Sequence, residues 1–349
     1  MRSSSEKKLI ILTVIVVVII IAIAAFIAYA FLSNGKNSSE NNMNFQLYNE
    51  SNSKPTVNTE NNIGQNTVVP VENSNNEQAQ TQGSSTTDTN TYYYKQLSNT
   101  AKKIYDGLKK HKEDMKTGTY VIDFGTEFNS ILNGADGEEI LNQEYQSAWN
   151  AFSYDNVDLY YLDINKVSMV MEARTEGATT TYYVKIGPGD YSSYLSSTFA
   201  NKKEIEDADA YIKDIRNQVM SILGPYNNAM KIKVVNEWMI DNLSYENIEG
   251  NNNKYNLYGA IVETKVVCEG YARMFKYIMD GLNIPCILVS GTATNSEGET
   301  ELHAWNYVEL NGQWYAVDVT WNDPVVIGEG ELTESQKSKY LLKGKSFLD

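Results

Sequence analysis

The sequence has 349 residues, of which 44 are acidic and 29 are basic, so its formal net charge is −15 at neutral pH. It contains no basic stripe with interleaved aromatic residues, which argues against nucleic acid as a partner. A hydrophobic fraction of 42%, with 25 tyrosines and 5 tryptophans, suffices for a core that needs no disulfide bonds.

Residues 9–32 form an apolar run of 24 positions without a charged residue. An α-helix of this length exceeds the hydrocarbon core of a bilayer, which is about 30 Å thick. Arg2, Lys7 and Lys8 precede the run, so the positive-inside rule places the N-terminus in the cytoplasm. We therefore expect residues 1–32 to be a cytoplasmic tip and membrane anchor of a single-pass cell-membrane protein whose folded part is extracellular.

A cleaved signal peptide is the alternative interpretation of this segment. Ala28-Tyr29-Ala30 has the small-residue pattern of a processing site, and cleavage there would produce a secreted protein. The apolar run is longer than the roughly 7 to 15 residues usual in signal peptides, which favours the anchor. In both cases the folded part is exported.

The next segment, residues 33–91, consists mainly of Asn, Ser, Thr, Gln and Glu with few large apolar residues. Such a composition cannot bury enough apolar surface to offset the entropy that ordering costs. The sequence therefore predicts a disordered polar linker between the anchor and the folded part.

Residues 92–200 have a different composition and are predicted to form an accessory α+β region. Apolar residues recur at helical spacing from Leu97 to Leu108, and a second helix is expected near 138–152. Four segments read as strands: 119–124, 158–164, 166–174 and 179–186. Several of these strands are rich in tyrosine, which is typical of sheet packing, with a ligand-binding face as the alternative.

Residues 201–349, the C-terminal region, are predicted to begin with helices at 204–223 and 226–243. A third helix is expected to start at Cys268, because apolar residues follow it on one face, and to end before Asn283 and Pro285. Strands are predicted at 286–292, 301–310 and 313–321. The last two are separated by Asn311-Gly312, a common two-residue hairpin turn.

Cys268 therefore lies in the first turn of the predicted third helix. Free N–H groups and the helix dipole at this position favour the thiolate over the thiol. The cysteine is therefore a candidate nucleophile. The alternatives are a buried apolar residue or a disulfide with Cys286, the other cysteine of the chain. A helix of 14 residues separates the two by about 21 Å, whereas a disulfide needs Cα atoms within about 7 Å. We therefore expect Cys286 to be a packing residue.

A cysteine nucleophile usually needs a base, and the chain has two histidines. His111 ends a charged helical segment and is expected at the surface. His303 lies in a predicted strand. If Asn311 and Gly312 form the hairpin turn, Trp305 faces Asp318 across the two strands and His303 becomes a diagonal neighbour of this aspartate.

Taken alone, the His303–Asp318 pair is equally compatible with a structural hydrogen bond in a sheet. Together with Cys268 it supplies the nucleophile, base and orienting residue of acyl transfer through a thioester. A zinc site built from the same three residues lacks support from any CxxC or HxxxH spacing. The sequence also has no phosphate loop or dinucleotide fingerprint, so no metal or other cofactor is expected.

Two segments then resemble the transglutaminase-like superfamily, specifically its exported bacterial members with a papain-like core. They are YGAIVETKVVCEGYARMFKYIMDGLNIPCILVSGTA and HAWNYVELNGQWYAVDVTWNDP, whose motifs CEGYA, HAWN and VDVTW are specific in combination. The resemblance implies an α+β fold in which a nucleophile helix packs on an antiparallel sheet. It also implies that Cys268 is the nucleophile, His303 the base and Asp318 the third residue.

Activity is left open by the resemblance, because the superfamily includes protein cross-linkers, amidases, peptidases and proteins without known catalysis. We expect a membrane-anchored extracellular cysteine enzyme that acts on amide bonds of proteins or peptides, including those of the cell wall. Hydrolysis is favoured over amine transfer, since nothing in the sequence marks an amine-binding site. The alternative is a non-catalytic surface module that binds wall or protein ligands.

Overall fold

The structure, a computed structural model, describes residues 91–349 with gaps at 248, 295–297, 299, 325–331 and 345–349. All described residues belong to one compact unit of the chain. The predicted membrane anchor, and all but the last residue of the predicted linker, lie outside the described residues. Within the described ranges, no helix has both the length and the apolar character needed to cross a membrane.

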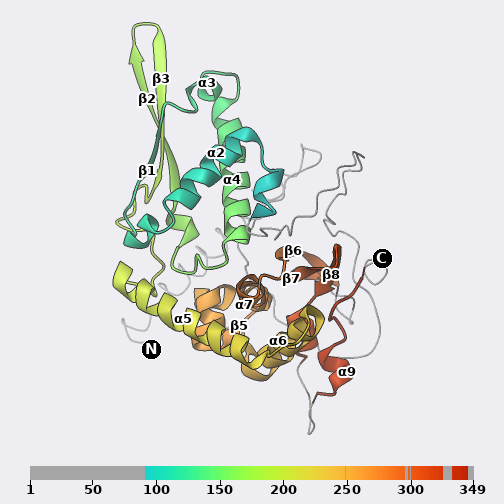
Figure 1. The fold of residues 1–349 in the computed structure, drawn as a ribbon. Helices are drawn as coiled ribbons and strands as arrows, with labels where there is room; N and C mark the ends of the chain where they lie inside the picture. Colours follow the sequence, from blue (N-terminus) through green and yellow to red (C-terminus); the bar gives the residue numbers. More distant parts are fainter. Residues whose placement is uncertain (1–90, 248, 295–297, 299, 325–331, 345–349) are drawn as a thin grey trace, which may run out of the picture. The chain divides into compact units, whose positions relative to one another are not determined.

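The accessory region contains two main helices that pack on each other and a three-stranded antiparallel sheet (Figure 1). The sheet order is β1-β3-β2. The elements are α2 (Asn99–Lys110), β1 (Ile122–Gly125), α3 (Asn129–Leu132), α4 (Gly137–Asp155), β2 (Ser168–Glu176) and β3 (Thr179–Gly187). These elements confirm both predicted helices and three of the four predicted strands.

The strand predicted at residues 158–164 is wrong. This segment is a turn followed by a single bridge between Leu162 and Leu195. Its consecutive residues Leu159, Tyr160, Tyr161 and Leu162 are all buried. A short apolar run does not distinguish a buried strand from a buried connection, and here the run fills the core without pairing.

The C-terminal region is built around one helix, α7, which packs on a three-stranded antiparallel sheet of order β6-β7-β8 (Figure 1). The main elements are α5 (Lys202–Ile222), α6 (Asn228–Asn242), α7 (Cys268–Gly281), β6 (Cys286–Thr294), β7 (Thr300–Leu310) and β8 (Gln313–Val317). This arrangement confirms the predicted α+β class, with a helix that begins at Cys268 on an antiparallel sheet.

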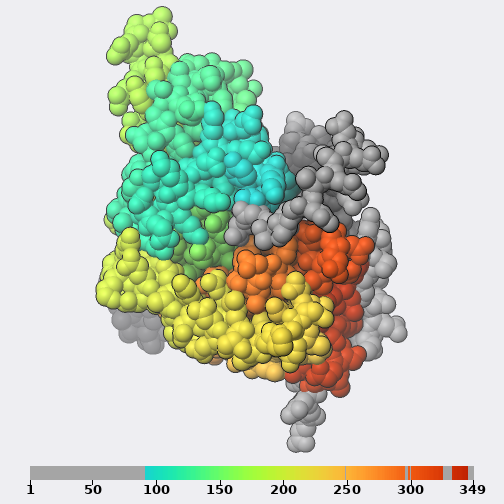
Figure 2. Space-filling view, in the orientation of Figure 1, coloured from blue at the N-terminus to red at the C-terminus, as the bar shows by residue number. Residues whose placement is uncertain are grey.

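Helix α5 lies at the surface of the molecule (Figure 2). Its N-terminus is capped by Asn201, whose side-chain oxygen accepts the N–H of Glu204. Only three of its side chains are buried, and they recur once every seven residues: Ile205, Ile212 and Val219. This spacing gives a narrow apolar stripe. Helix α5 also contacts α7, where the guanidinium of Arg216 lies over the ring of Tyr277.

The hairpin between β7 and β8 has the predicted register, in which Leu310 pairs with Gln313 and Asn306 pairs with Val317. The predicted strand continues to residue 321, but β8 ends at Val317 and a short helix, α8 (Val319–Asn322), follows. Asp318 is the N-cap of α8 and accepts the N–H of Trp321 at 3.0 Å. The capping bond competes with strand pairing and ends the ladder.

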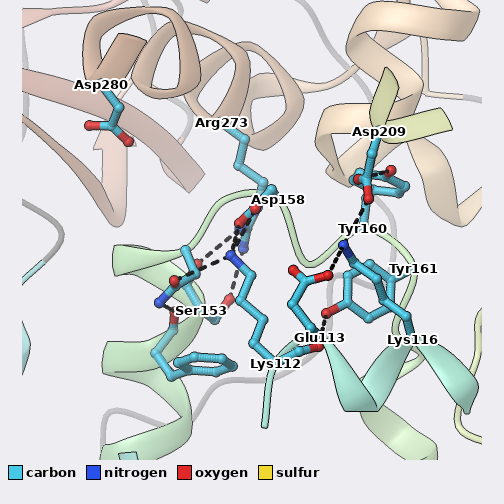
Figure 3. Close-up of polar contacts among 12 residues, drawn as sticks. Lys112, Glu113, Lys116, Ser153, Asp158, Tyr160, Tyr161, Asp209, Arg273 and Asp280 are labelled. Atoms are coloured by element: carbon cyan, nitrogen blue, oxygen red, sulfur yellow. Dashed lines mark hydrogen bonds and ion pairs between the residues drawn. The ribbon is translucent and has the colours of Figure 1, made fainter. Parts of the chain in front are cut away.

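Figure 3 shows how polar side chains join the accessory region to α5 and α7. Lys116 donates to Asp209 of α5 at 2.8 Å, and the hydroxyl of Tyr160 donates to the same carboxylate at 2.6 Å. Arg273 of α7 donates to the carbonyl of Ser153, at the end of α4, at 3.2 Å. The two regions are therefore connected through specific hydrogen bonds both at α5 and at the helix that begins with Cys268.

A second connection lies at the start of the described chain. The buried carboxylate of Asp155 accepts the N–H of Tyr93 at 3.3 Å and that of Tyr94 at 3.1 Å. It also accepts the hydroxyl of Tyr105 at 3.2 Å. Tyr93 in turn donates its hydroxyl to the carbonyl of Leu288 in β6 at 2.6 Å. The segment at Tyr93 thus links α4 to the sheet of the C-terminal region.

The buried ion pair inside α7 provides a stability test. Lys276 is 1% exposed and donates to Asp280 at 2.9 Å and to the carbonyl of Cys286 at 3.1 Å. Lys276→Met removes a buried cation from both acceptors, so urea denaturation should show a loss of about 3–5 kcal/mol in the free energy of unfolding.

The matched control is Lys203→Met, because Lys203 forms an i,i+4 pair with Asp207 in which both side chains are largely exposed. This variant should leave the free energy of unfolding nearly unchanged, because a solvent-exposed ion pair contributes little to stability. Equal losses in the two variants would show that Lys276 contributes no more than a surface pair.

Candidate active site

Cys268 is the first residue of α7 and follows directly from β5 (Lys265–Val266) and the N-cap residue Val267. The N–H of Val267 donates to the carbonyl of Lys254 at 3.0 Å, which fixes the entry into the helix. Gly270 is required by this packing, because a Cβ there would lie 2.5 Å from Cβ of Val266 and 2.9 Å from the carbonyl oxygen of Lys254. The first turn of α7 therefore lies directly against the incoming chain.

His303 lies on β7, opposite Gly291 of β6, and is 3% exposed. Its ring is stacked between two tryptophans, with centroids 4.8 Å from Trp321 and 5.8 Å from Trp305. Its Nε2 lies 2.6 Å from Oδ2 of Asp318. The imidazole is thus held by ring packing and by one short hydrogen bond.

Asp318 uses its two carboxylate oxygens for two different donors. Oδ2 accepts the Nε2–H of His303, and Oδ1 accepts the backbone N–H of Trp321. The backbone N–H of Asp318 itself donates to the carbonyl of Tyr340 at 3.0 Å. The predicted proximity of His303 and Asp318 is present, although it comes from the end of β8 and the start of α8 and not from a continued ladder.

The electrostatics of the site favour a charged imidazole. Burial lowers the pKa of His303, but the charge and hydrogen bond of Asp318, together with interaction with Cys268, outweigh it and raise the pKa from 6.5 to about 10. Because Nε2 is bonded to Asp318, Nδ1 is the ring nitrogen left to face the thiol. Such an arrangement can exchange a proton between the cysteine sulfur and the leaving group of an acyl transfer.

The first turn of α7, which carries the candidate nucleophile Cys268, is also stabilised by an ion pair. Glu269 accepts two hydrogen bonds from Arg273, from Nε at 2.9 Å and from Nη2 at 2.7 Å. Arg273 is mostly buried and also donates to Ser153 of the accessory region. Sequence reasoning missed this clamp, although the i,i+4 spacing of Glu269 and Arg273 on a helix is a visible signal.

The remaining cysteine and histidine lie outside this cluster. Both cysteines are free, which excludes the disulfide alternative, and Cys286 is fully buried in β6, where burial raises the pKa of its thiol. His111 stacks on Tyr120 and pairs with Asp114 at 2.9 Å. Among the described residues, no group of three or more His, Cys, Asp or Glu side chains is arranged to hold a metal ion.

Comparison with known proteins identifies the fold around this cluster. Residues 216–319 match the model of the transglutaminase-like superfamily. The kyphoscoliosis peptidases of Mus musculus and Homo sapiens are each 25% identical to this chain over an alignment of 157 residues. The match covers 40% of this chain. The chain spans only about a quarter of the length of these relatives, with 23% of each covered.

Solved structures overlap with the chain only in part. The crystal structure of a TGase has a TM-score of 0.31 and 12% identity, and the match covers 50% of each chain. A cysteine protease from Cytophaga hutchinsonii, described as putative, has a TM-score of 0.28 and 16% identity over 44% of this chain and 64% of its own. The match over residues 216–319, which includes Cys268, His303 and Asp318, identifies a domain of the transglutaminase-like superfamily in this chain.

Proposed function

We propose that this domain is a cysteine enzyme that acts on amide bonds of proteins or peptides through a thioester. The observation that carries the proposal is the 2.6 Å hydrogen bond between His303 and Asp318, together with the interaction of His303 with Cys268 at the start of α7. The pairing raises the pKa of His303 and so favours the imidazolium, whose charge stabilises a neighbouring thiolate. The name of the mammalian relatives, a peptidase, supports the same class of reaction.

The mechanism follows from these positions. The thiolate of Cys268 attacks the carbonyl carbon of the amide, while the imidazolium of His303 stands ready to protonate the leaving amine. The carbon–nitrogen bond then breaks and a thioester remains on Cys268. A water molecule, deprotonated by the now neutral His303, attacks the thioester and releases the acid. Asp318 holds the imidazole in the required orientation and tautomer throughout.

Hydrolysis is the preferred outcome, because a transferase must shield the thioester from water. Three tryptophans near the hairpin are candidates for such a shield, but all three are engaged in packing. Trp314 contacts the ring of Tyr92 at 5.9 Å, and Trp305 and Trp321 stack on His303. This engagement supports attack by water over attack by a bound amine.

A non-catalytic surface module for wall or protein ligands is the second candidate. The observation that favours it is the low exposure of the cluster, 4% for Cys268 and 3% for His303. Such low exposure is compatible with a domain that retains Cys268, His303 and Asp318 but does not catalyse acyl transfer. The first experiment below distinguishes the two candidates.

Cys268→Ala should abolish the release of ammonia or new amino termini from glutamine-containing proteins and wall peptides, because the thioester cannot form. Cys286→Ala, the matched control, should retain activity, since that thiol is buried away from the cluster. A fluorescent primary amine in the assay separates the two reaction types by mass spectrometry. Efficient incorporation of the amine would contradict hydrolysis. If Cys268 of the wild-type protein reacts neither with substrates nor with iodoacetamide, the non-catalytic binding module is favoured.

Asp318→Asn should move the high-pH limb of the kcat/KM profile toward neutrality. The charge of Asp318 raises the pKa of His303, so its removal lowers this pKa and the imidazolium is lost at a lower pH. The two donors lie on different oxygens of Asp318, and asparagine keeps only one of these oxygens. The variant should therefore be partly active and Asp318→Ala less active. Asp323→Asn is the control, because this carboxylate binds Tyr271 and not His303. An unmoved limb in Asp318→Asn would contradict the proposed pairing.

We also propose that residues 9–32 anchor the enzyme in the cell membrane with the folded part outside, as their length and flanking charges indicate. External protease on intact cells should cut within residues 33–90 and release a folded fragment that begins near Tyr92. Immunoblotting of the medium and the cells would follow this release. Mature protein starting at Phe31 in the medium would instead support cleavage and secretion.

A further inference from the structure

The sheet of the accessory region has one long edge with which no described strand pairs. Strand β2 lies at this edge, because the sheet order is β1-β3-β2 (Figure 1). It spans nine residues, contains no proline and pairs with β3 without a bulge. A strand edge of this kind is a template for pairing with another chain.

The turn that joins β2 to β3 determines which backbone groups point away from the sheet. Glu176 pairs with Thr179 across the two-residue turn at 177–178, so this pair is hydrogen-bonded. Hydrogen-bonded and non-hydrogen-bonded pairs alternate along an antiparallel ladder. Four residues of β2 therefore direct their N–H and C=O groups outward: Met169, Met171, Ala173 and Thr175. Among the described residues, none forms a backbone hydrogen bond to these outward groups.

The side chains that alternate with these residues carry both signs of charge. Glu172 and Arg174 lie on the same face of β2, and their side chains are 43% and 65% exposed. Glu172 also pairs with Lys185 at 3.3 Å, and the guanidinium of Arg174 lies over the ring of Tyr183. Charged residues on an edge strand usually prevent pairing. A strand that pairs here must therefore present the opposite charge at each position.

A second copy of β2 meets this condition. If two copies run antiparallel with Ala173 opposite Ala173, Glu172 of each copy lies opposite Arg174 of the other. The Ala173 pair is then hydrogen-bonded, and the two Glu172–Arg174 pairs are non-hydrogen-bonded pairs, in which side chains lie closest. The same register places Val170, which is 38% exposed, against the stem of Glu176. A shift of two residues in either direction would bring two glutamates or two arginines into opposition.

We propose that two copies of this chain associate through β2, with Ala173 on the two-fold axis. Each copy presents the same strand to the other, as a two-fold interface requires. The two sheets then form one continuous sheet in the order β1-β3-β2-β2-β3-β1. This association goes beyond the proposed function and does not depend on Cys268.

Two charge reversals test the register in the full-length protein, held in detergent micelles. Glu172→Arg places an arginine opposite Arg174, and Arg174→Glu places a glutamate opposite Glu172. Sedimentation velocity should show a dimer for the wild type, and each variant should raise the dimer dissociation constant at least about 10-fold. An equimolar mixture of the two variants should dimerise again, because each reversed residue then meets the opposite charge. This recovery also shows that both variants are folded.

A disulfide tests the position of the two-fold axis. On oxidation, Ala173→Cys should link two copies, because the Cα atoms of a hydrogen-bonded pair lie about 5.5 Å apart, within the reach of a disulfide. Ala178→Cys is the matched control, since this alanine is also exposed but lies opposite Ser168 in the proposed register. Non-reducing electrophoresis measures the linked dimer, and mass spectrometry of the linked peptide identifies the cysteine.

Several results would overturn the proposal. A wild-type protein that is monomeric at every concentration would leave β2 as an edge for an extended peptide of another protein. A dimer that neither charge reversal weakens would show that the two chains meet elsewhere. Two reversed variants that stay monomeric when mixed would contradict the register, as would cross-linking of Ala178→Cys without cross-linking of Ala173→Cys.

Discussion

The geometry of the site depends on one carboxylate, that of Asp318, at the point where β8 ends. One oxygen holds His303 and the other caps α8, while the backbone N–H of the same residue binds the carbonyl of Tyr340. The direction of the imidazole and the path of the chain after the sheet are therefore set by the same side chain. Because a carboxylate offers two acceptors at a fixed angle, the orientation of the His303 ring is coupled to the correct formation of α8. The two tryptophan rings that stack on His303 complete this constraint.

The accessory region contributes to the same site through its contacts with α7 and β6. Arg273, four residues after Glu269, is held by Ser153, and the hydroxyl of Tyr154 is 2.6 Å from that of Ser290. Ser290 precedes Gly291, the partner of His303 across β6 and β7. The helix that begins with Cys268 and the strand beside His303 are thus both bonded to residues at the end of α4. Such bonds from a separate part of the chain restrict the relative movement of α7 and the sheet.

Much of this site is encoded by local sequence. The Asn311-Gly312 turn fixes the register of β7 and β8, and the apolar spacing after Cys268 fixes α7, so both were predictable. The end of β8 was not, because the capping oxygen of Asp318 competes with strand pairing only once α8 forms. The parallel pairing of β4 (Ser244–Tyr245) with β5 was also missed, since two residues on each strand give no periodic signal. The turn at 158–164 was misread because buried connections and buried strands have the same composition.

Asp155, which accepts the N–H groups of Tyr93 and Tyr94, has a consequence for tolerance to acid. Burial raises the pKa of this carboxyl from 3.8 to about 6, despite the hydrogen bonds that lower it. The folded chain therefore takes up a proton here as the pH falls through 6, whereas the unfolded chain does so only near 3.8. Protonation of Asp155 adds to the free energy of unfolding over this interval, opposite to the effect of most carboxyls that are bonded in a folded protein. The link between α4 and the start of the described chain is thus suited to mildly acidic surroundings.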